Sequence, residues 1–137
     1  ECREPAAARR LLRRAIPKEH VKFLSGFADT ASFGKYLFVH AGIRPGVPLA
    51  KQAGQDLRWI RGPFLDDESD HGRIVIHGHT ISAEVDERHN RIGLDTGACW
   101  TGVLTAIGLQ GDERWYLQTA SSPAESGTAR VANFSEA

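Results

Sequence analysis

Three histidines lie at the ends of two apolar segments, where their side chains could bind a metal or move a proton. Tyr36–Val39 leads into His40, and Ile74–Ile76 leads into His77 and His79. Neutral imidazole is the commonest metal ligand in proteins, and histidine also serves as a general base when a neighbour orients it. A single histidine at a strand end more often makes ordinary hydrogen bonds in a turn. Three interpretations are therefore open: a metal site, a catalytic base with an orienting neighbour, or turn chemistry.

The segments that carry these histidines are typical of buried strands. Tyr36–Val39 is nearly continuous in apolar residues, as in a strand covered on both faces, and residues 73–80 repeat the design. Ligands gather at the loops that follow the strands of a layered α/β sheet, because the scaffold there is rigid and the side chains face a crevice. Two strand ends of this kind in one chain strengthen the metal hypothesis.

Two helices are expected before the first of these strands. Residues 4–14 are rich in helix-forming residues, with basic side chains towards the end, where the helix dipole favours positive charge. Residues 17–27 carry an apolar stripe at helical spacing, which we interpret as core packing: Val21, Phe23, Leu24 and Phe27. Trp59 and Trp100 are interpreted as core residues as well.

The remainder of the chain predicts mainly strands and loops. Residues 56–65 indicate a short helix or turn, broken at Gly62-Pro63. Three strands in an antiparallel meander are expected over residues 90–100, 102–109 and 114–119. Residues 120–137 lose periodicity and fill with small polar residues, so we expect a disordered tail there.

Composition narrows the class of protein. The 137 residues suffice for one domain, and the 17 basic residues balance the 17 acidic ones, so no overall charge would recruit nucleic acid or an anionic membrane. Cys2 and Cys99 form no metal-binding spacing, and no stretch reaches the roughly 20 apolar residues of a membrane helix. We expect a soluble cytoplasmic protein. A chain without methionine that begins at Glu1 is also expected to be part of something longer.

Four segments occur in one order with short spacers, and together they resemble one family. They are YLFVHAGIRPGVPL (36–49), DLRWIRGPFL (56–65), VIHGHT (75–80) and RIGLDTGACWTGVLTAIGL (91–109). They resemble the C-terminal half of a bacterial calcineurin-like metallophosphoesterase, in the branch of the serine/threonine protein phosphatases and the related diadenosine tetraphosphatases. The resemblance implies an α/β fold in which residues 1–119 supply the C-terminal part of an αββα sandwich, mostly β after two helices.

The resemblance also implies roles for individual residues. His40 and His79 match the ligands of the second of two divalent metals, with manganese expected and iron or zinc as alternatives. Arg61 matches an arginine that binds the substrate phosphate, and a guanidinium suits that role because its rigid fork of donors matches phosphate oxygens. His77 matches no family ligand, so it is interpreted as a neighbour of the metal ligands or of the substrate, or as a structural residue. Asp95 is interpreted as a turn-forming residue.

The implied substrate is a phosphate ester, either a phosphoprotein or a small phosphoester. Many relatives carry a further histidine where this chain has Ile81, and its absence favours the phosphoprotein phosphatase and tetraphosphatase branch over nucleases. The segments HAGIRPG and WIRGPFL look more like the bacterial protein phosphatases.

The family's upstream motifs do not occur in this chain: Asp-x-His, Gly-Asp followed by Asp-Arg, and Gly-Asn-His. Two imidazoles cannot hold a pair of metals at the roughly 4 Å separation of two-metal hydrolysis. We therefore expect half a site, an inactive isolated chain, and the missing N-terminal half as a partner. The alternative is a non-catalytic remnant or a module that binds a partner through an exposed sheet edge.

Overall fold

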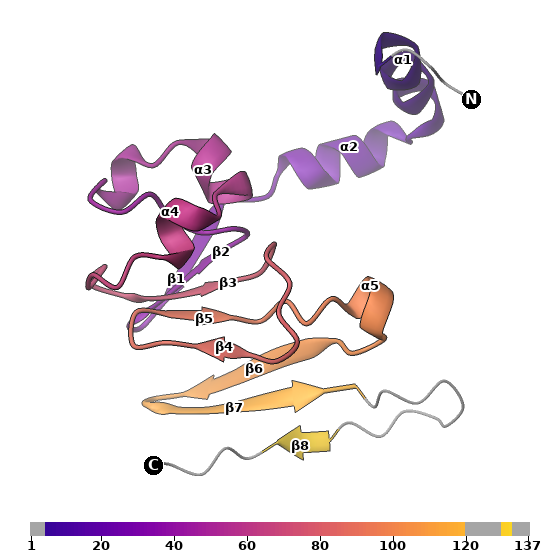
Figure 1. Cartoon of the computed structure of the whole chain (residues 1–137). Helices are drawn as coiled ribbons and strands as arrows, with labels where there is room; N and C mark the ends of the chain where they lie inside the picture. The colour runs from indigo at the N-terminus through magenta and orange to yellow at the C-terminus, as the bar shows by residue number, and fades with distance from the viewer. Residues whose placement is uncertain (1–4, 120–129, 133–137) are drawn as a thin grey trace.

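A five-stranded mixed sheet positions the two strand ends that carry the histidines (Figure 1). The computed structural model describes residues 5–119 and 130–132. The strand order is β1-β2-β3-β5-β4, with β1 (Thr30–Phe33), β2 (Tyr36–Val39), β3 (Ile74–His77), β4 (Asp86–Glu87) and β5 (Arg91–Gly93). Both β2 and β5 run parallel to β3, while β1 and β4 pair antiparallel at the two edges. The carboxyl ends of β2, β3 and β5 therefore meet at one edge of the sheet.

Short helices cover one face of this sheet. They are the 3-10 helix η1 (Leu49–Lys51), α3 (Gly54–Trp59) and α4 (Gly62–Leu65). Leu57 and Phe64 pack from these helices onto Leu37 and Val75 of the sheet. Burial of such apolar side chains contributes roughly 1.5–3 kcal/mol each, so this layer holds the loops after β2 and β3 in place.

The helix or turn expected over residues 56–65 is confirmed, but its break lies earlier than predicted. The backbone leaves helical geometry at Ile60 and Arg61, and α4 begins at Gly62 with Pro63 in its first turn. Proline suits the start of a helix because its missing N–H would have no helical partner there.

A second sheet covers the other face and contains β6 (Thr105–Gln110), β7 (Glu113–Gln118) and β8 (Arg130–Ala132), paired antiparallel. Tyr116 of β7 packs with Tyr36, Ile76 and Ile92 of the first sheet. The Tyr116 hydroxyl and the Arg114 guanidinium both donate hydrogen bonds to the Glu87 carboxylate of β4. The result is a layered arrangement of helices, mixed sheet and antiparallel sheet.

The meander expected after residue 90 is only partly confirmed. Residues 105–118 form the antiparallel hairpin, whereas Arg91–Gly93 joins the first sheet parallel to β3. The residues between them turn into the helix α5 (Ala98–Thr101), which is flanked by Gly97 and Gly102, both in left-handed conformation. Within the expected tail, residues 130–132 form β8, and the rest of that segment lies outside the described residues.

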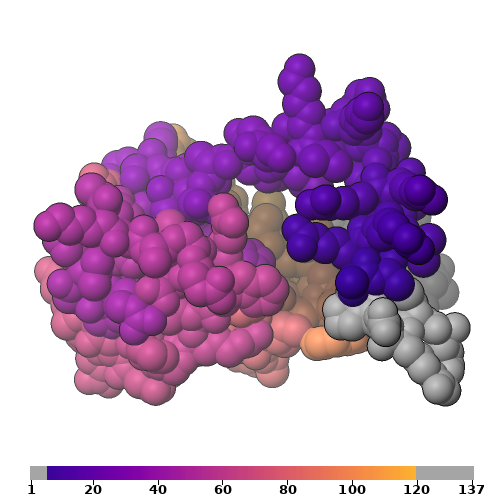
Figure 2. All heavy atoms as spheres, turned by 90° about the horizontal axis from the view of Figure 1, so that it is seen from above, coloured from indigo at the N-terminus to yellow at the C-terminus, as the bar shows by residue number. Residues whose placement is uncertain are grey.

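The two predicted N-terminal helices are confirmed as α1 (Pro5–Ala15) and α2 (Lys18–Ser25). The prediction that the α2 stripe is core is wrong, because no residue of α2 is buried and Phe23 is 67% exposed. Figure 2 shows the indigo helix α1 standing apart from the magenta part of the chain, which contains α3 and α4, with a hollow between them. A groove of about 980 Å³ lies between α2 and the first sheet, lined on the α2 side by Val21, Leu24 and Phe27 and on the sheet side by Val39 and His40, among others. The apolar spacing identified the face of the helix, but no described element covers that face.

In the described part of the chain, no helix has the length and apolar character to cross a bilayer.

Candidate active site at the carboxyl ends of β2 and β3

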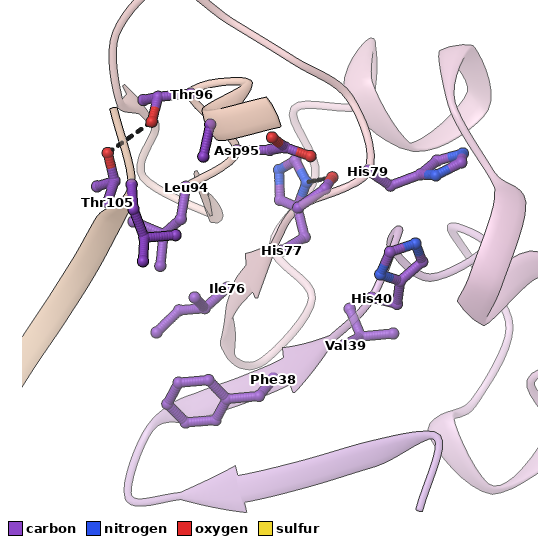
Figure 3. A pocket seen from close by; sticks show the side chains of 13 residues that line it. Phe38, Val39, His40, Ile76, His77, His79, Leu94, Asp95, Thr96 and Thr105 are labelled. Carbon is purple, nitrogen blue, oxygen red and sulfur yellow. Dashed lines mark hydrogen bonds between the residues drawn. The ribbon is translucent and has the colours of Figure 1, made fainter. Parts of the chain in front are cut away.

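His40 and His79 lie beside each other, as predicted from their strand ends (Figure 3). Their ring centroids are 5.1 Å apart and their planes are inclined by 57°. The cause is the parallel register that pairs Phe38 with Ile76, because its continuation brings His40 to Gly78. The Gly78 N–H accordingly donates to the His40 carbonyl at 2.9 Å. Metal–nitrogen bonds of about 2.1 Å would put two rings on one ion roughly 5 Å apart, so this spacing suits a shared ion.

A strained backbone aims the second imidazole. His79 has φ 65°, the only positive value at a non-glycine residue among residues 5–119 and 130–132. Left-handed geometry costs an L-residue about 1–2 kcal/mol. Strain of this kind collects at functional sites, where the surrounding structure enforces it. The chain thus turns abruptly after β3 and brings the His79 ring back towards His40.

The surroundings of His79 favour its neutral form. Partial burial lowers the pKa of His79 below its ordinary value, and the nearby Arg61 and His40 lower that pKa further, whereas the Asp95 carboxylate opposes the shift. A metal ligand must be the neutral imidazole, so the electrostatics suit ligation.

Arg61 reaches the same edge from the start of α4. Its Nη1 donates to the Thr80 hydroxyl at 3.0 Å, one residue beyond His79. Arg61 makes no ion pair within the described part of the chain. A guanidinium has five N–H donors, so Arg61 retains donors for an anion beside the histidines.

His77 belongs to the packing of the sheet and not to the histidine pair. Its ring is buried and stands edge to face with Phe64 at 5.1 Å, on the face covered by α4. Its Nδ1 lies 3.1 Å from the Gly78 carbonyl oxygen, while its buried Nε2 has no hydrogen-bond partner. Burial lowers the pKa of His77, and the Gly78 carbonyl acts in the opposite direction. The structural interpretation of His77 therefore holds.

Asp95 makes the turn that its sequence predicts. Its Oδ1 accepts the Gly97 N–H at 3.0 Å. Because β5 runs parallel to β3 with His77 paired to Gly93, the same register brings Asp95 beside His79. The carboxylate is thus close enough to His79 to raise the pKa of its imidazole.

A pocket of about 340 Å³ opens at this edge between the two sheets (Figure 3). Apolar side chains line it together with polar groups that include His40, His79, Asp95, Thr96 and Thr105. The Thr96 and Thr105 hydroxyls bond each other at 2.8 Å.

The described residues bring two candidate metal ligands together, His40 and His79, and not a complete site. Across residues 5–119 and 130–132, no group of three or more His, Cys, Asp or Glu side chains is arranged to hold an ion. Structural zinc takes four ligands and catalytic zinc usually takes three from protein. The His40–His79 pair fits part of such a set.

The prediction that Trp59 and Trp100 are core residues is wrong. Their side chains are 62% and 80% exposed. The Trp59 ring stands perpendicular to the His79 ring with centroids 5.5 Å apart, so Trp59 belongs to the site. The sequence offered one sign of this, because Trp59 lies two residues before Arg61, the candidate phosphate-binding residue. We assigned it to the core instead because tryptophan is usually well buried.

Comparison with known proteins finds similarity in sequence over part of the chain and similarity in fold over most of it. The chain is 37% identical over 62 residues to the symmetrical bis(5'-nucleosyl)-tetraphosphatases of Neisseria gonorrhoeae (strain ATCC 700825 / FA 1090) and Neisseria meningitidis serogroup A. That match covers 45% of this chain and 21% of each relative. A crystal structure of a "putative diadenosine tetraphosphatase" superposes with a TM-score of 0.64 at 19% identity, covering 82% of this chain and 60% of that one. No family model matches.

The chain thus spans less than two thirds of the relatives and of the solved structure that it matches. The α/β fold predicted from the resemblance to metallophosphoesterases is confirmed by the structural match. In sequence over 62 residues, and in fold over most of its length, this chain is similar to part of the diadenosine tetraphosphatases.

Proposed function

We propose that this chain contributes the two-histidine part of a metal-dependent phosphohydrolase site. The observation that carries the proposal is the convergence of His40 and His79, with ring centroids 5.1 Å apart, beside a guanidinium anchored on Thr80. Two neutral imidazoles suit a divalent ion, and an arginine fork suits a phosphate. The match to tetraphosphatases supports hydrolysis of phosphate bonds as the reaction class.

In this proposal His40 and His79 hold one of two divalent ions, with manganese the first choice and iron or zinc as alternatives. A bound ion supplies Lewis acidity, which polarises the phosphate and lowers the pKa of water. The role of Arg61 is to bind phosphate oxygens and neutralise the charge that develops on them. The role of the backbone around Gly78 is to hold both imidazoles at fixed spacing, since its N–H bonds the His40 carbonyl.

We further propose a nucleotide polyphosphate as substrate, because the matched relatives are named as tetraphosphatases. A phosphoprotein is the second candidate. It is favoured by the segments HAGIRPG and WIRGPFL, which look like those of bacterial serine/threonine phosphatases. The two candidates differ in the group attached to the phosphate, so competition between them is directly measurable.

The remaining ligands are proposed to come from polypeptide that packs into the groove beside α2. The groove is lined by Val21, Leu24 and Phe27 and extends to His40, so an occupant would touch the site itself. β1 is an edge strand, and no described strand pairs with its outer side. Such an edge suits the addition of a strand from another polypeptide. The competing view, a non-catalytic module that uses this edge to bind a partner, predicts binding without hydrolysis.

Reconstitution tests the proposal. The chain with manganese should hydrolyse p-nitrophenyl phosphate and diadenosine tetraphosphate no faster than buffer. Adding a polypeptide with the Asp-x-His, Gly-Asp and Gly-Asn-His motifs should produce turnover, and His79→Ala should abolish that turnover. Turnover that survives in a His40→Ala, His79→Ala double variant would overturn the assignment.

A further inference from the structure

Trp59 is an exposed aromatic side chain at the rim of the histidine pair. Its 62% exposure is large for an indole, whose body gains free energy when it leaves water. One side of the ring is engaged, because the His79 ring meets it at 90° with centroids 5.5 Å apart. The open surface of the indole therefore lies next to the proposed metal-binding imidazole.

The backbone and a neighbouring ion pair hold Trp59 in this position. It is the last residue of α3, and the following Ile60 N–H bonds the Asp56 carbonyl at 3.0 Å. The preceding Arg58 is fixed to the Asp29 carboxylate by two hydrogen bonds of 2.7 and 3.0 Å. The indole is therefore presented by anchored neighbours, which limits the entropy that a ligand must remove on binding.

Trp59 is close both to Arg61, the proposed phosphate-binding residue, and to the groove beside α2. Arg61 follows it by two residues and bonds Thr80, while Trp59 and His40 both line the groove beside α2. A phosphate held by Arg61 at the histidine pair would thus leave its organic substituent close to the indole. A flat aromatic substituent could stack on that ring, whereas the short alkyl chain of phosphoserine could not.

We propose that Trp59 is a specificity-determining residue that stacks on a nucleobase attached to the phosphate. This inference rests on the proposed function of Arg61 and the histidine pair, and it adds the residue that selects nucleotides. Stacking between a base and an aromatic ring tolerates any base, because every base has a π-face. Loss of such a ring weakens binding by roughly tenfold.

Nuclear magnetic resonance on the full ¹⁵N-labelled chain tests the inference without requiring turnover. The probes are AMP, ribose 5-phosphate and inorganic phosphate, and a Trp59→Phe variant assigns the Trp59 indole signal. All three probes should shift the Thr80 amide and the Arg61 side-chain signals. AMP alone should shift the Trp59 indole signal, and Trp59→Ala should weaken AMP binding about tenfold while leaving ribose 5-phosphate unchanged.

The matched control is Trp100→Ala, which removes a still more exposed indole on α5 and should leave AMP binding unchanged. Because Trp59 is exposed, its truncation should keep the chain folded, and the thermal midpoint verifies this. Equal affinity for AMP and ribose 5-phosphate, unaffected by Trp59→Ala, would overturn the inference. The proposal that Arg61 binds the phosphate would stand. Failure of every probe to shift Arg61 or Thr80 would overturn the proposed function and the inference with it.

Discussion

The Arg61 guanidinium donates from Nη1 to the Thr80 hydroxyl at 3.0 Å, which ties the start of α4 to the turn that carries His79. Arg61→Lys would keep the positive charge but lose the rigid fork that matches two phosphate oxygens. In a reconstituted enzyme we expect a loss of about 1–3 kcal/mol in transition-state stabilisation, read from kcat/KM on a phosphate monoester. Metal content should be unchanged, because the two histidines remain.

The control for that substitution is Arg73→Lys. Arg73 is also exposed, but it bonds the Gly34 carbonyl at 3.0 Å, in the turn between β1 and β2. Its substitution should leave kcat/KM at the wild-type value. Equal kcat/KM for Arg61→Lys and wild type would show that Arg61 does not bind the phosphate.

Two substitutions of His79 separate its ligand role from its backbone strain. Both His79→Gly and His79→Ala remove the imidazole, so calorimetry should find the same loss of manganese affinity in the reconstituted protein. Glycine tolerates the observed φ of 65°, whereas alanine does not. We expect His79→Gly to exceed His79→Ala in free energy of unfolding by about 1 kcal/mol, measured in urea. Equal stabilities would show that the left-handed conformation is not maintained in solution.

The sequence predicts the site best where the backbone alone decides the geometry. His40 and His79 could be paired in advance because both follow apolar runs and because the resemblance to metallophosphoesterases implied that they share a metal. The parallel pairing of β2 and β3 then brings the two strand ends to one edge. The left-handed turn at His79 could not be foreseen, since it depends on the loop that packs around it. His77 has the same local sequence context, but its ring lies on the same side of β3 as Val75, against Phe64. Alternation along a strand would put His79 on that side as well, and the left-handed turn at His79 prevents this.

The errors arise where a residue's environment depends on tertiary contacts that local spacing does not determine. The stripe at Phe23 and Phe27 has the spacing of a core helix, but the two rings contact each other at 4.8 Å and remain exposed. Trp59 was assigned to the core because tryptophan is usually well buried. Residues 91–93 were assigned to a meander because periodicity identifies a strand but cannot name its neighbour; the pairing with β3 is a tertiary choice.

Stability should fall as the pH drops through the histidine range. Burial lowers the pKa of His77 from its ordinary value of 6.5, so the folded chain takes up its proton only at lower pH than the unfolded chain does. Between these two values the unfolded state binds more protons, and stability decreases with falling pH. The contribution is complete above the unfolded value and is lost towards the folded one.

Urea unfolding at neutral pH and at about pH 5 checks this, because ordinary carboxylates titrate mostly near pH 4. His77→Gln should flatten the pH dependence. His79 also has a lowered pKa, so His79→Gln should remove a separate part of the slope. An unchanged slope in the His77 variant would show that its ring is not buried in the neutral form.

The loop after β2 should not tolerate a side chain at Gly42. A Cβ there would lie 2.3 Å from Cδ1 of Phe64, a fully buried ring. Overpacking of this kind typically costs about 1–3 kcal/mol, so Gly42→Ala should lower the urea midpoint. The control is Gly54→Ala, where the nearest atom, Asp29 Oδ2, would be 3.6 Å away. A Gly42→Ala variant as stable as the Gly54→Ala variant would contradict the packing of Phe64 on the loop.

The exposed face of α2 should matter for assembly and little for the stability of the chain itself. Leu24 and Phe27 are 59% and 61% exposed and line the groove that reaches His40. Surface substitutions away from buried contacts usually change stability by no more than about 0.5 kcal/mol, so Leu24→Ser and Phe27→Ser should leave the urea midpoint nearly unchanged. Val75→Ala, in the fully buried centre of β3, should lower it clearly and serves as the matched comparison. In reconstitution we expect the opposite ranking of the variants. The two serine variants, and not Val75→Ala, should need a higher concentration of added polypeptide to reach half-maximal turnover, because an apolar partner loses contact area on the exposed face. Serine variants that reconstitute at the wild-type concentration would show that the remaining ligands do not arrive through this groove.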